Sequence, residues 1–197
     1  MSDLLLVRHG ETEWSASGRH TGRTDVPLTA DGADQAVSLA PYFLDRRPAL
    51  VLTSPLRRAV ATTRLAGLTA DDTDPDLCEW DYGGYEGLTT EEIRRTRSDW
   101  SLWRDGVPPG DPEHPGENAG QVAARADRVL ARVAPVLAEG RGNAVLVAHG
   151  HFLRVLTARY LGLPAEEGRL FLLRTGTVSM LSTEHGLPVI SGWNTRP

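Results

Sequence analysis

Two short apolar runs, far apart in the chain, both stop at a histidine followed by a glycine. The first is "LLLVRHG" at residues 4–10, and the second is "VLVAHG" at residues 145–150. Apolar runs of this length, bounded by polar residues, predict buried strands. A third run, "ALVLTS" at residues 49–54, is also followed by a helix-like segment. Strands that alternate with helices predict an α/β fold with a mainly parallel sheet.

Caps and prolines set the expected helix boundaries. One helix is predicted to begin after Thr29 and to run to about Leu44. Another has Ser54 as its N-cap, with a proline directly after it in the first turn, where proline is tolerated. A third follows an apolar face over residues 122–137. Pro135 lies inside that pattern, which predicts a kink or a break near the helix end.

The chain is expected to form one domain. No linker-like composition divides it, so we predict a single domain over residues 1–197. Residues 104–120 are rich in glycine, proline and acids, and a short helical pattern precedes them. We therefore predict a lid or insertion at about residues 89–120. Two probable strands, at 177–183 and 187–193, flank a turn near the C-terminus.

The composition excludes several kinds of chemistry. Hydrophobic residues make up 40% and charged residues 24%, as in ordinary globular proteins. All 21 basic residues are arginine, so no mechanism can use a Schiff-base or P-loop lysine. The net charge is −5 and no basic run occurs, so nucleic acid is not an expected partner.

The cysteine count and the hydropathy pattern indicate a cytoplasmic protein. The single cysteine, Cys78, excludes an internal disulfide framework and a cysteine-rich zinc site. The apolar runs are too short to span a bilayer, so no membrane partner is expected. The N-terminus lacks the basic region that precedes the apolar run of a signal peptide. The sequence is compatible with either a monomer or a homodimer.

The strand ends carry the candidate chemistry. In open α/β sheets, sites form outside the carboxyl ends of the strands, which places His9 and His149 at the same edge. Arg8 lies beside His9, and Arg57 and Arg58 follow the strand at residues 49–54. The guanidinium fork suits phosphate, so this edge is predicted to bind a phosphorylated molecule.

The same groups suffice for phosphoryl transfer. A neutral imidazole is a competent nucleophile towards phosphorus, and a second histidine can stabilise the transferring oxygens. Glu79, in the loop after the helix, supplies a carboxyl group that can protonate the leaving oxygen. Arginine and histidine can neutralise the developing charge, so neither a metal nor another cofactor is expected.

A multi-part match adds to this interpretation. The chain resembles the histidine phosphatase superfamily, in its phosphoglycerate-mutase-like branch, and is particularly similar to the sedoheptulose-bisphosphatase-like and acid-phosphatase members. The segments that carry the resemblance are "RHGETEW", "GRHTGRTDVPLTADGADQA", "TSPLRRAVATT", "EWDYGGYEG", "GEN" and "VAHGHFLRVL". They occur in the family's order and cover nearly the whole chain. The resemblance implies a three-layer α/β/α fold and phosphomonoester hydrolysis through a phosphohistidine.

The resemblance also assigns expected roles. The catalytic set that it implies is His9 as nucleophile, Arg8 and Arg58 as phosphate clamps, Glu79 as proton donor and His149 as second histidine. It implies that Thr21, Gly22 and Gly150 line the pocket. Ser15 replaces an asparagine of many mutases, and Asn118 makes the motif "GEN" instead of the more usual "GES". We expect both at the substrate, together with Arg104 of "WRDG" and His151.

Several side chains also have a simpler interpretation. "HGH" offers a metal pair, but no third ligand follows at a useful spacing, so His151 is predicted to bind substrate. His20, His114 and His185 are expected in loops or at the surface, with His20 the candidate for the pocket mouth. Glu86 is expected to be a helix cap or a surface acid.

Three functions are compatible with the sequence. The first is a phosphomonoester hydrolase acting on small phosphorylated metabolites, by resemblance sugar phosphates or bisphosphates. The second is a cofactor-dependent phosphoglycerate mutase, and the third is a non-enzymatic phosphate-binding module. All the matched catalytic positions are filled, which disfavours the third. Mutases resemble one another in a longer basic insertion after the glutamate segment. This chain is shorter there and lacks lysine, which favours hydrolysis.

Overall fold

The central sheet has the strand order β3-β2-β4-β1-β5-β6 in the computed structural model, which describes residues 2–196. Its strands are β1 (Leu4–Arg8), β2 (Leu50–Thr53), β3 (Asp72–Thr73), β4 (Ala144–Ala148), β5 (Val178–Glu184) and β6 (Leu187–Thr195). Strands β1 to β4 pair in parallel, and β5 and β6 add two antiparallel pairings. The prediction of an α/β fold with a mainly parallel sheet is therefore confirmed.

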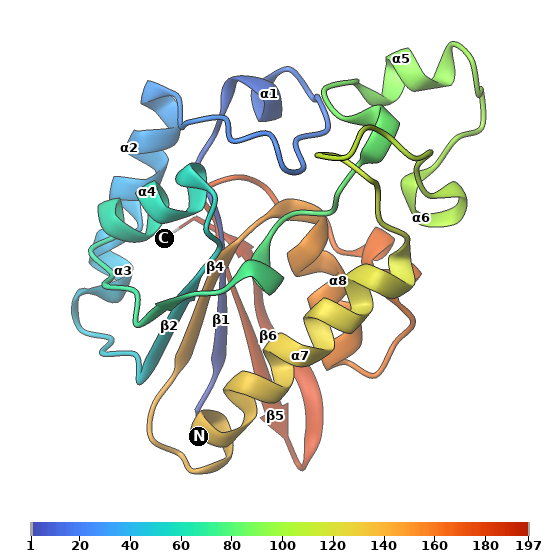
Figure 1. The fold of residues 1–197 in the computed structure, drawn as a ribbon. Helices are drawn as coiled ribbons and strands as arrows, with labels where there is room; N and C mark the ends of the chain where they lie inside the picture. The colour runs from blue at the N-terminus through green and yellow to red at the C-terminus, as the bar shows by residue number, and fades with distance from the viewer. Residues whose placement is uncertain (1, 197) are drawn as a thin grey trace.

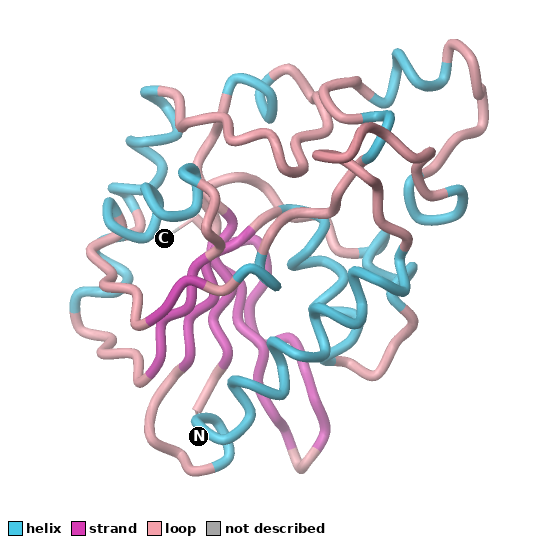
Figure 2. The backbone as a smooth tube through the Cα atoms, in the orientation of Figure 1, coloured by secondary structure: helices cyan, strands magenta, loops and turns pink. Residues whose placement is uncertain are grey.

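Helices cover both faces of this sheet (Figure 1). They are α1 (Glu13–Ala16), α2 (Ala30–Ser38), α3 (Ala40–Leu44), α4 (Arg57–Leu65), α5 (Thr90–Arg94), α6 (Leu102–Asp105), α7 (Ala119–Ala138) and α8 (Gly150–Tyr160). Short 3-10 helices are η1 (Pro75–Leu77), η2 (Gly83–Tyr85) and η3 (Ala165–Leu170). Figure 2 shows the strands as a single layer between the two groups of helices. No helix within residues 2–196 has the length and apolar character needed to cross a membrane.

Strand alternation divides the core into two layers. Leu4 and Leu6 of β1 pack into one cluster with residues of α7 and α8. Leu5 and Val7 of the same strand point the other way, into a second cluster with Leu39 and residues of α3 and α4. Successive side chains of a strand face opposite sides, so a strand that is apolar throughout needs cover on both faces. The result is a three-layer α/β/α arrangement.

Two predicted helix boundaries were wrong. The helix expected from Thr29 to Leu44 is split into α2 and α3, because Pro41 lacks the N–H group that would continue the ladder. Helix α4 begins at Arg57, with Leu56 instead of Ser54 at its N-cap. Helix α7 ends at Ala138, within one turn of Pro135 and close to the predicted end of its apolar face.

The segment over residues 89–120 lies beyond the carboxyl ends of the strands, where its first residues stand beside the loop that follows α1 (Figure 1). The segment packs onto the core through three buried side chains, Ile93, Trp100 and Leu102, which belong to the same cluster as residues of α7 and α8. Its role as a lid stays a prediction.

Candidate active site

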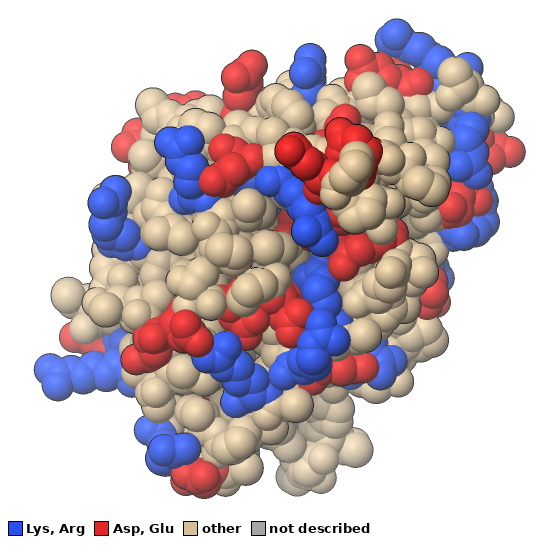
Figure 3. Space-filling view, in the orientation of Figure 1, with Lys and Arg blue, Asp and Glu red and all other residues tan. Residues whose placement is uncertain are grey.

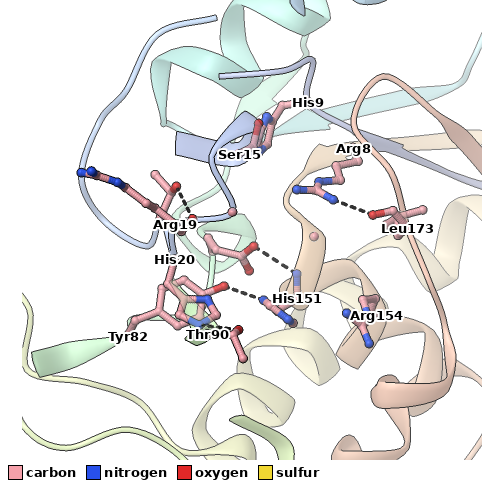
Figure 4. Close-up of a pocket in the computed structure, with 14 residues that line it drawn as sticks. Arg8, His9, Ser15, Arg19, His20, Tyr82, Thr90, His151, Arg154 and Leu173 are labelled. Atoms are coloured by element: carbon pink, nitrogen blue, oxygen red, sulfur yellow. Dashed lines mark hydrogen bonds between the residues drawn. The ribbon is translucent and has the colours of Figure 1, made fainter. Parts of the chain in front are cut away.

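A cavity of about 280 Å³ opens at the carboxyl ends of β1 and β4. Figure 4 shows Arg8, His9 and His151 converging on it from these strand ends. The parallel register places Arg8 opposite Ala148, so the two histidine-glycine pairs leave the sheet side by side. The two apolar runs of the sequence predict that His9 and His149 lie at the same edge of the sheet, as they do here.

His9 is held as a neutral imidazole with one nitrogen free. Its backbone N–H donates to Ala148 O at 3.0 Å, and its Nδ1–H donates to Gly10 O at 2.7 Å. The second ring nitrogen, Nε2, therefore carries a lone pair at the cavity wall. Burial, and next the charges of Arg58 and Arg8, hold the pKa of His9 well below 6.5. A neutral imidazole in this tautomer is ready to act as a nucleophile.

Arg8 supplies a positive charge directly beside His9. Its Nη1 donates to Leu173 O, while its buried Nε has no hydrogen-bond partner among residues 2–196. A Cβ added at Gly150 would lie 3.1 Å from the Arg8 Cζ, so a larger residue there would displace the guanidinium by a few tenths of an ångström. A buried donor without a partner is a ready site for an anion.

Arg58 and His149 lie behind the cavity wall. Arg58 Nε–H donates to His149 Nδ1 at 3.1 Å, so the remaining proton of neutral His149 sits on Nε2 and is donated to Ser54 Oγ at 2.7 Å. Burial, followed by the charge of Arg58, lowers the pKa of His149 well below 6.5. The rings of His149 and His9 are 5.1 Å apart between centroids. Ser54 Oγ also accepts from Leu56 N at 3.3 Å, but α4 begins only at Arg57.

Glu79 is fixed at the N-terminus of α8. Its Oε1 accepts from the backbone N–H groups of Trp80 at 2.9 Å and Phe152 at 2.8 Å, and its Oε2 accepts from His151 N at 3.0 Å. These side-chain oxygens satisfy N–H groups of the first turn of α8 that have no carbonyl partner within the helix. The carboxyl group lines the same cavity as His9.

Arginines on α7 hold the segment that leads to Glu79. Arg125 donates to the carbonyl groups of Asp76, Cys78 and Glu79. Further ion pairs along the helix join Arg125 to Glu117, Arg128 to Asp76, and Arg132 to Asp72 and Asp74. Figure 3 shows basic and acidic side chains interleaved on this face of the molecule. The α7 arginines thus form ion pairs with acidic side chains, and Arg125 also holds the backbone that leads to Glu79.

An aromatic wall closes the other side of the cavity. The Tyr82 hydroxyl and His151 Nδ1 are 2.6 Å apart. Burial raises the pKa of Tyr82 well above 10, so the phenol keeps its proton and donates to His151. His20 stacks on Tyr82 with 4.8 Å between ring centroids, and burial lowers the pKa of His20 to about 4. His20 therefore lines the pocket, and it does so as a neutral ring.

Of the other residues predicted to contact the substrate, some line the cavity and others lie outside it. Thr21, Ser15, Gly150 and His151 line the cavity, although the Ser15 hydroxyl is bonded to the Thr12 backbone. Gly22 lies behind the wall, where its N–H group donates to Glu86.

Arg104 and Asn118, both predicted at the substrate, lie outside the cavity. Arg104 is exposed, is paired with Asp105, and borders a separate hollow beside α6. Asn118 is also exposed and caps α7 by accepting from Gln121 N at 3.0 Å. Both side chains satisfy local structure, so neither reaches the cavity.

The sequence reasoning missed several residues at the site, among them Arg19, Thr90 and Arg154 of the cavity lining and Glu86 behind it. Arg154 lies one helical turn beyond Gly150 on α8 and lines the cavity. Glu86 is half-buried and accepts backbone N–H groups from the loop after α1. The spacing from Gly150 to Arg154 puts both on one helix face, which was a usable signal. No local pattern marks the long-range contact of Glu86.

Histidine beside arginine at the carboxyl edge of a three-layer sheet defines a site for phosphoryl chemistry. A sequence profile of the histidine phosphatase superfamily (branch 1) matches residues 4–196. The chain belongs to this family and is a phosphatase.

Individual relatives match over most of the chain. It is 41% identical to the acid phosphatase of Mycobacterium tuberculosis over 93% of this chain and 88% of that protein. It is 35% identical to sedoheptulose 1,7-bisphosphatase of Saccharomyces cerevisiae over 83% and 69% of the two chains. The solved structure of a functionally characterised open reading frame of Mycobacterium tuberculosis superimposes with a TM-score of 0.91 at 39% identity, covering 99% of this chain and 98% of the other.

Proposed function

We propose that this phosphatase hydrolyses small sugar phosphates or bisphosphates through a phosphohistidine on His9. The observation that carries the proposal is the tautomer of His9, whose Nδ1–H is bonded to Gly10 O and whose Nε2 is free. Arg8 beside it supplies a buried donor for a phosphate oxygen.

The residues support a two-step displacement. In the first step His9 Nε2 forms a bond to phosphorus, the ester P–O bond breaks, and the leaving oxygen takes a proton from the Glu79 carboxyl group. In the second step a water attacks phosphorus, its proton returns to Glu79, the P–N bond breaks and phosphate is released. The Arg8 guanidinium stabilises the charge on the transferring oxygens directly, and Arg58, held against His149 behind the cavity wall, adds its positive charge at longer range. Preorganised donors of this kind lower the barrier without reorganisation during the reaction.

The lining of the cavity supports a polar substrate with a further anionic group. Arg154 donates through Nε to Gly168 O and through Nη2 to Arg169 O. These bonds hold the guanidinium in place and leave Nη1 for the substrate. The Tyr82–His151 pair and His20 offer a polar wall to hydroxyl groups. A phosphorylated sugar with a second phosphate satisfies both features.

Hydrolysis and mutase activity are separated by one assay. We expect steady release of inorganic phosphate from sugar phosphates and bisphosphates. We also expect little 2-phosphoglycerate from 3-phosphoglycerate supplied with catalytic 2,3-bisphosphoglycerate. The absence of lysine in the chain and its short insertion favour this outcome. Rapid interconversion of the phosphoglycerates without phosphate release would instead make the chain a mutase.

The free enzyme should keep His9 neutral in mildly acidic solution. Burial and the neighbouring arginines lower the pKa of His9, so the imidazole gains its proton only well below pH 6.5. Its ring C–H proton resonance, assigned by its loss in His9→Asn, should stay at the neutral position as the pH falls through 6.5. A titration midpoint at or above 6.5 would mean that the arginines do not act on this ring.

A further inference from the structure

The turn at residues 21–24 is held from two sides by opposite charges. The Glu86 carboxylate accepts from Gly22 N at 2.9 and 3.0 Å and from Thr24 N at 3.2 Å. Arg58 donates to the carbonyl groups of the same two residues, at 2.9 Å to each. One carboxylate therefore binds the donors of the turn, and one guanidinium binds its acceptors.

Close packing fixes the position of this turn. A Cβ added at Gly22 would lie 2.6 Å from the Glu86 Oε2 and 2.7 Å from Trp80 O. The backbone around Glu86 is itself held, because Glu86 N donates to Gly83 O at 3.0 Å and Gly87 N to His20 O at 2.9 Å. Glu86 thus joins the turn to the segment that carries Tyr82.

Because the turn orients the Arg58 guanidinium, it also orients the side chain of His149. The guanidinium is planar and rigid, so the carbonyl groups that orient its Nη atoms also orient its Nε–H. That N–H donates to His149 Nδ1 at 3.1 Å and leaves the proton of His149 on Nε2, facing Ser54 Oγ. A continuous hydrogen-bonded chain therefore runs from Glu86, through the turn and Arg58, to the histidine beside His9.

We propose that Glu86 is a positioning residue for phosphoryl transfer, which orients Arg58 and through it fixes the tautomer of His149. This inference rests on the proposed function, in which His9 accepts the phosphoryl group. Glu86 also acts electrostatically. Burial lowers the pKa of Arg58, and Glu86 is among the acidic groups that oppose this shift.

The kinetic test compares Glu86→Gln with Glu86→Asp, using p-nitrophenyl phosphate. Glutamine places an NH₂ group against a backbone N–H of the turn, whereas aspartate keeps both acceptor oxygens. We expect kcat to fall about 10- to 100-fold in Glu86→Gln, the size of effect that a small misplacement produces. Glu86→Asp should recover part of this loss. Glu91→Gln removes the same charge from an exposed side chain and should match the wild type.

A spectroscopic measurement separates positioning from general damage. Imidazole ¹⁵N shifts should show His149 protonated at Nε2 in the wild type and in Glu91→Gln, and a mixture of tautomers in Glu86→Gln. Wild-type kcat in Glu86→Gln would overturn the inference, and so would a loss of kcat with unchanged His149 signals. Failure of the proposed function gives a different result, because His9→Ala would then keep the wild-type rate.

Discussion

Replacing His9 with alanine should reduce phosphate release from every phosphomonoester by about 10⁴-fold or more, as expected when a hydrolase loses its covalent nucleophile. The loss should be as large for p-nitrophenyl phosphate as for a sugar phosphate, because a good leaving group does not replace the attacking atom. The structural reason is the free Nε2 of His9, whose ring is fixed by the bond from Nδ1–H to Gly10 O.

His185→Asn is a suitable control for this substitution. His185 lies in the exposed turn between β5 and β6, with a φ of 51° that asparagine accepts. Its variant should keep the wild-type rate, and both variants should show the wild-type circular dichroism spectrum. A folded His9→Ala protein that retains the wild-type rate would remove His9 from the mechanism.

Glu79→Gln should show a strong dependence on the leaving group. A sugar alkoxide needs a proton as the P–O bond breaks, whereas p-nitrophenolate leaves without one. Glutamine keeps the shape of the side chain and lacks the titratable proton. Sugar phosphates should therefore slow by about 10² to 10⁴, the usual range for loss of a general acid, and p-nitrophenyl phosphate far less.

The same comparison detects damage to the helix N-terminus. Glu79 accepts three backbone N–H groups, and an amide in its place has one acceptor oxygen fewer. If that loss displaced α8, both substrates would slow equally, and Glu79 would be a positioning group. An unchanged rate for sugar phosphates would contradict its assignment as the acid.

The strands and the convergence at their ends were predictable, because period and register follow from simple geometry. The apolar runs that end at His9 and His149 define buried parallel strands, and such strands share one carboxyl edge. The capping box at Thr89 and Glu92 and the turn before β6 likewise follow from local residue preferences.

The parts of the site that depend on long-range pairing were not predictable. Arg104 of "WRDG" and Asn118 of "GEN" are predicted at the substrate, yet their side chains bind local partners, Asp105 and the first turn of α7. Glu86 is the reverse case. Its sequence neighbours suggest a surface acid, and only the fold brings it to backbone groups 62 and 64 residues away. A residue's neighbours along the chain say little about contacts made across the sheet edge.

The bond that His9 forms to phosphorus can be measured directly. Wild-type enzyme mixed with excess ³²P-labelled sugar phosphate and quenched at the time of the first turnover should carry label on His9. That label should be lost in acid and kept in base, and Glu79→Gln should form it more slowly from the sugar phosphate than from p-nitrophenyl phosphate. Release of phosphate at the full rate with no label on the protein, or with the label on another residue, would contradict the phosphohistidine mechanism.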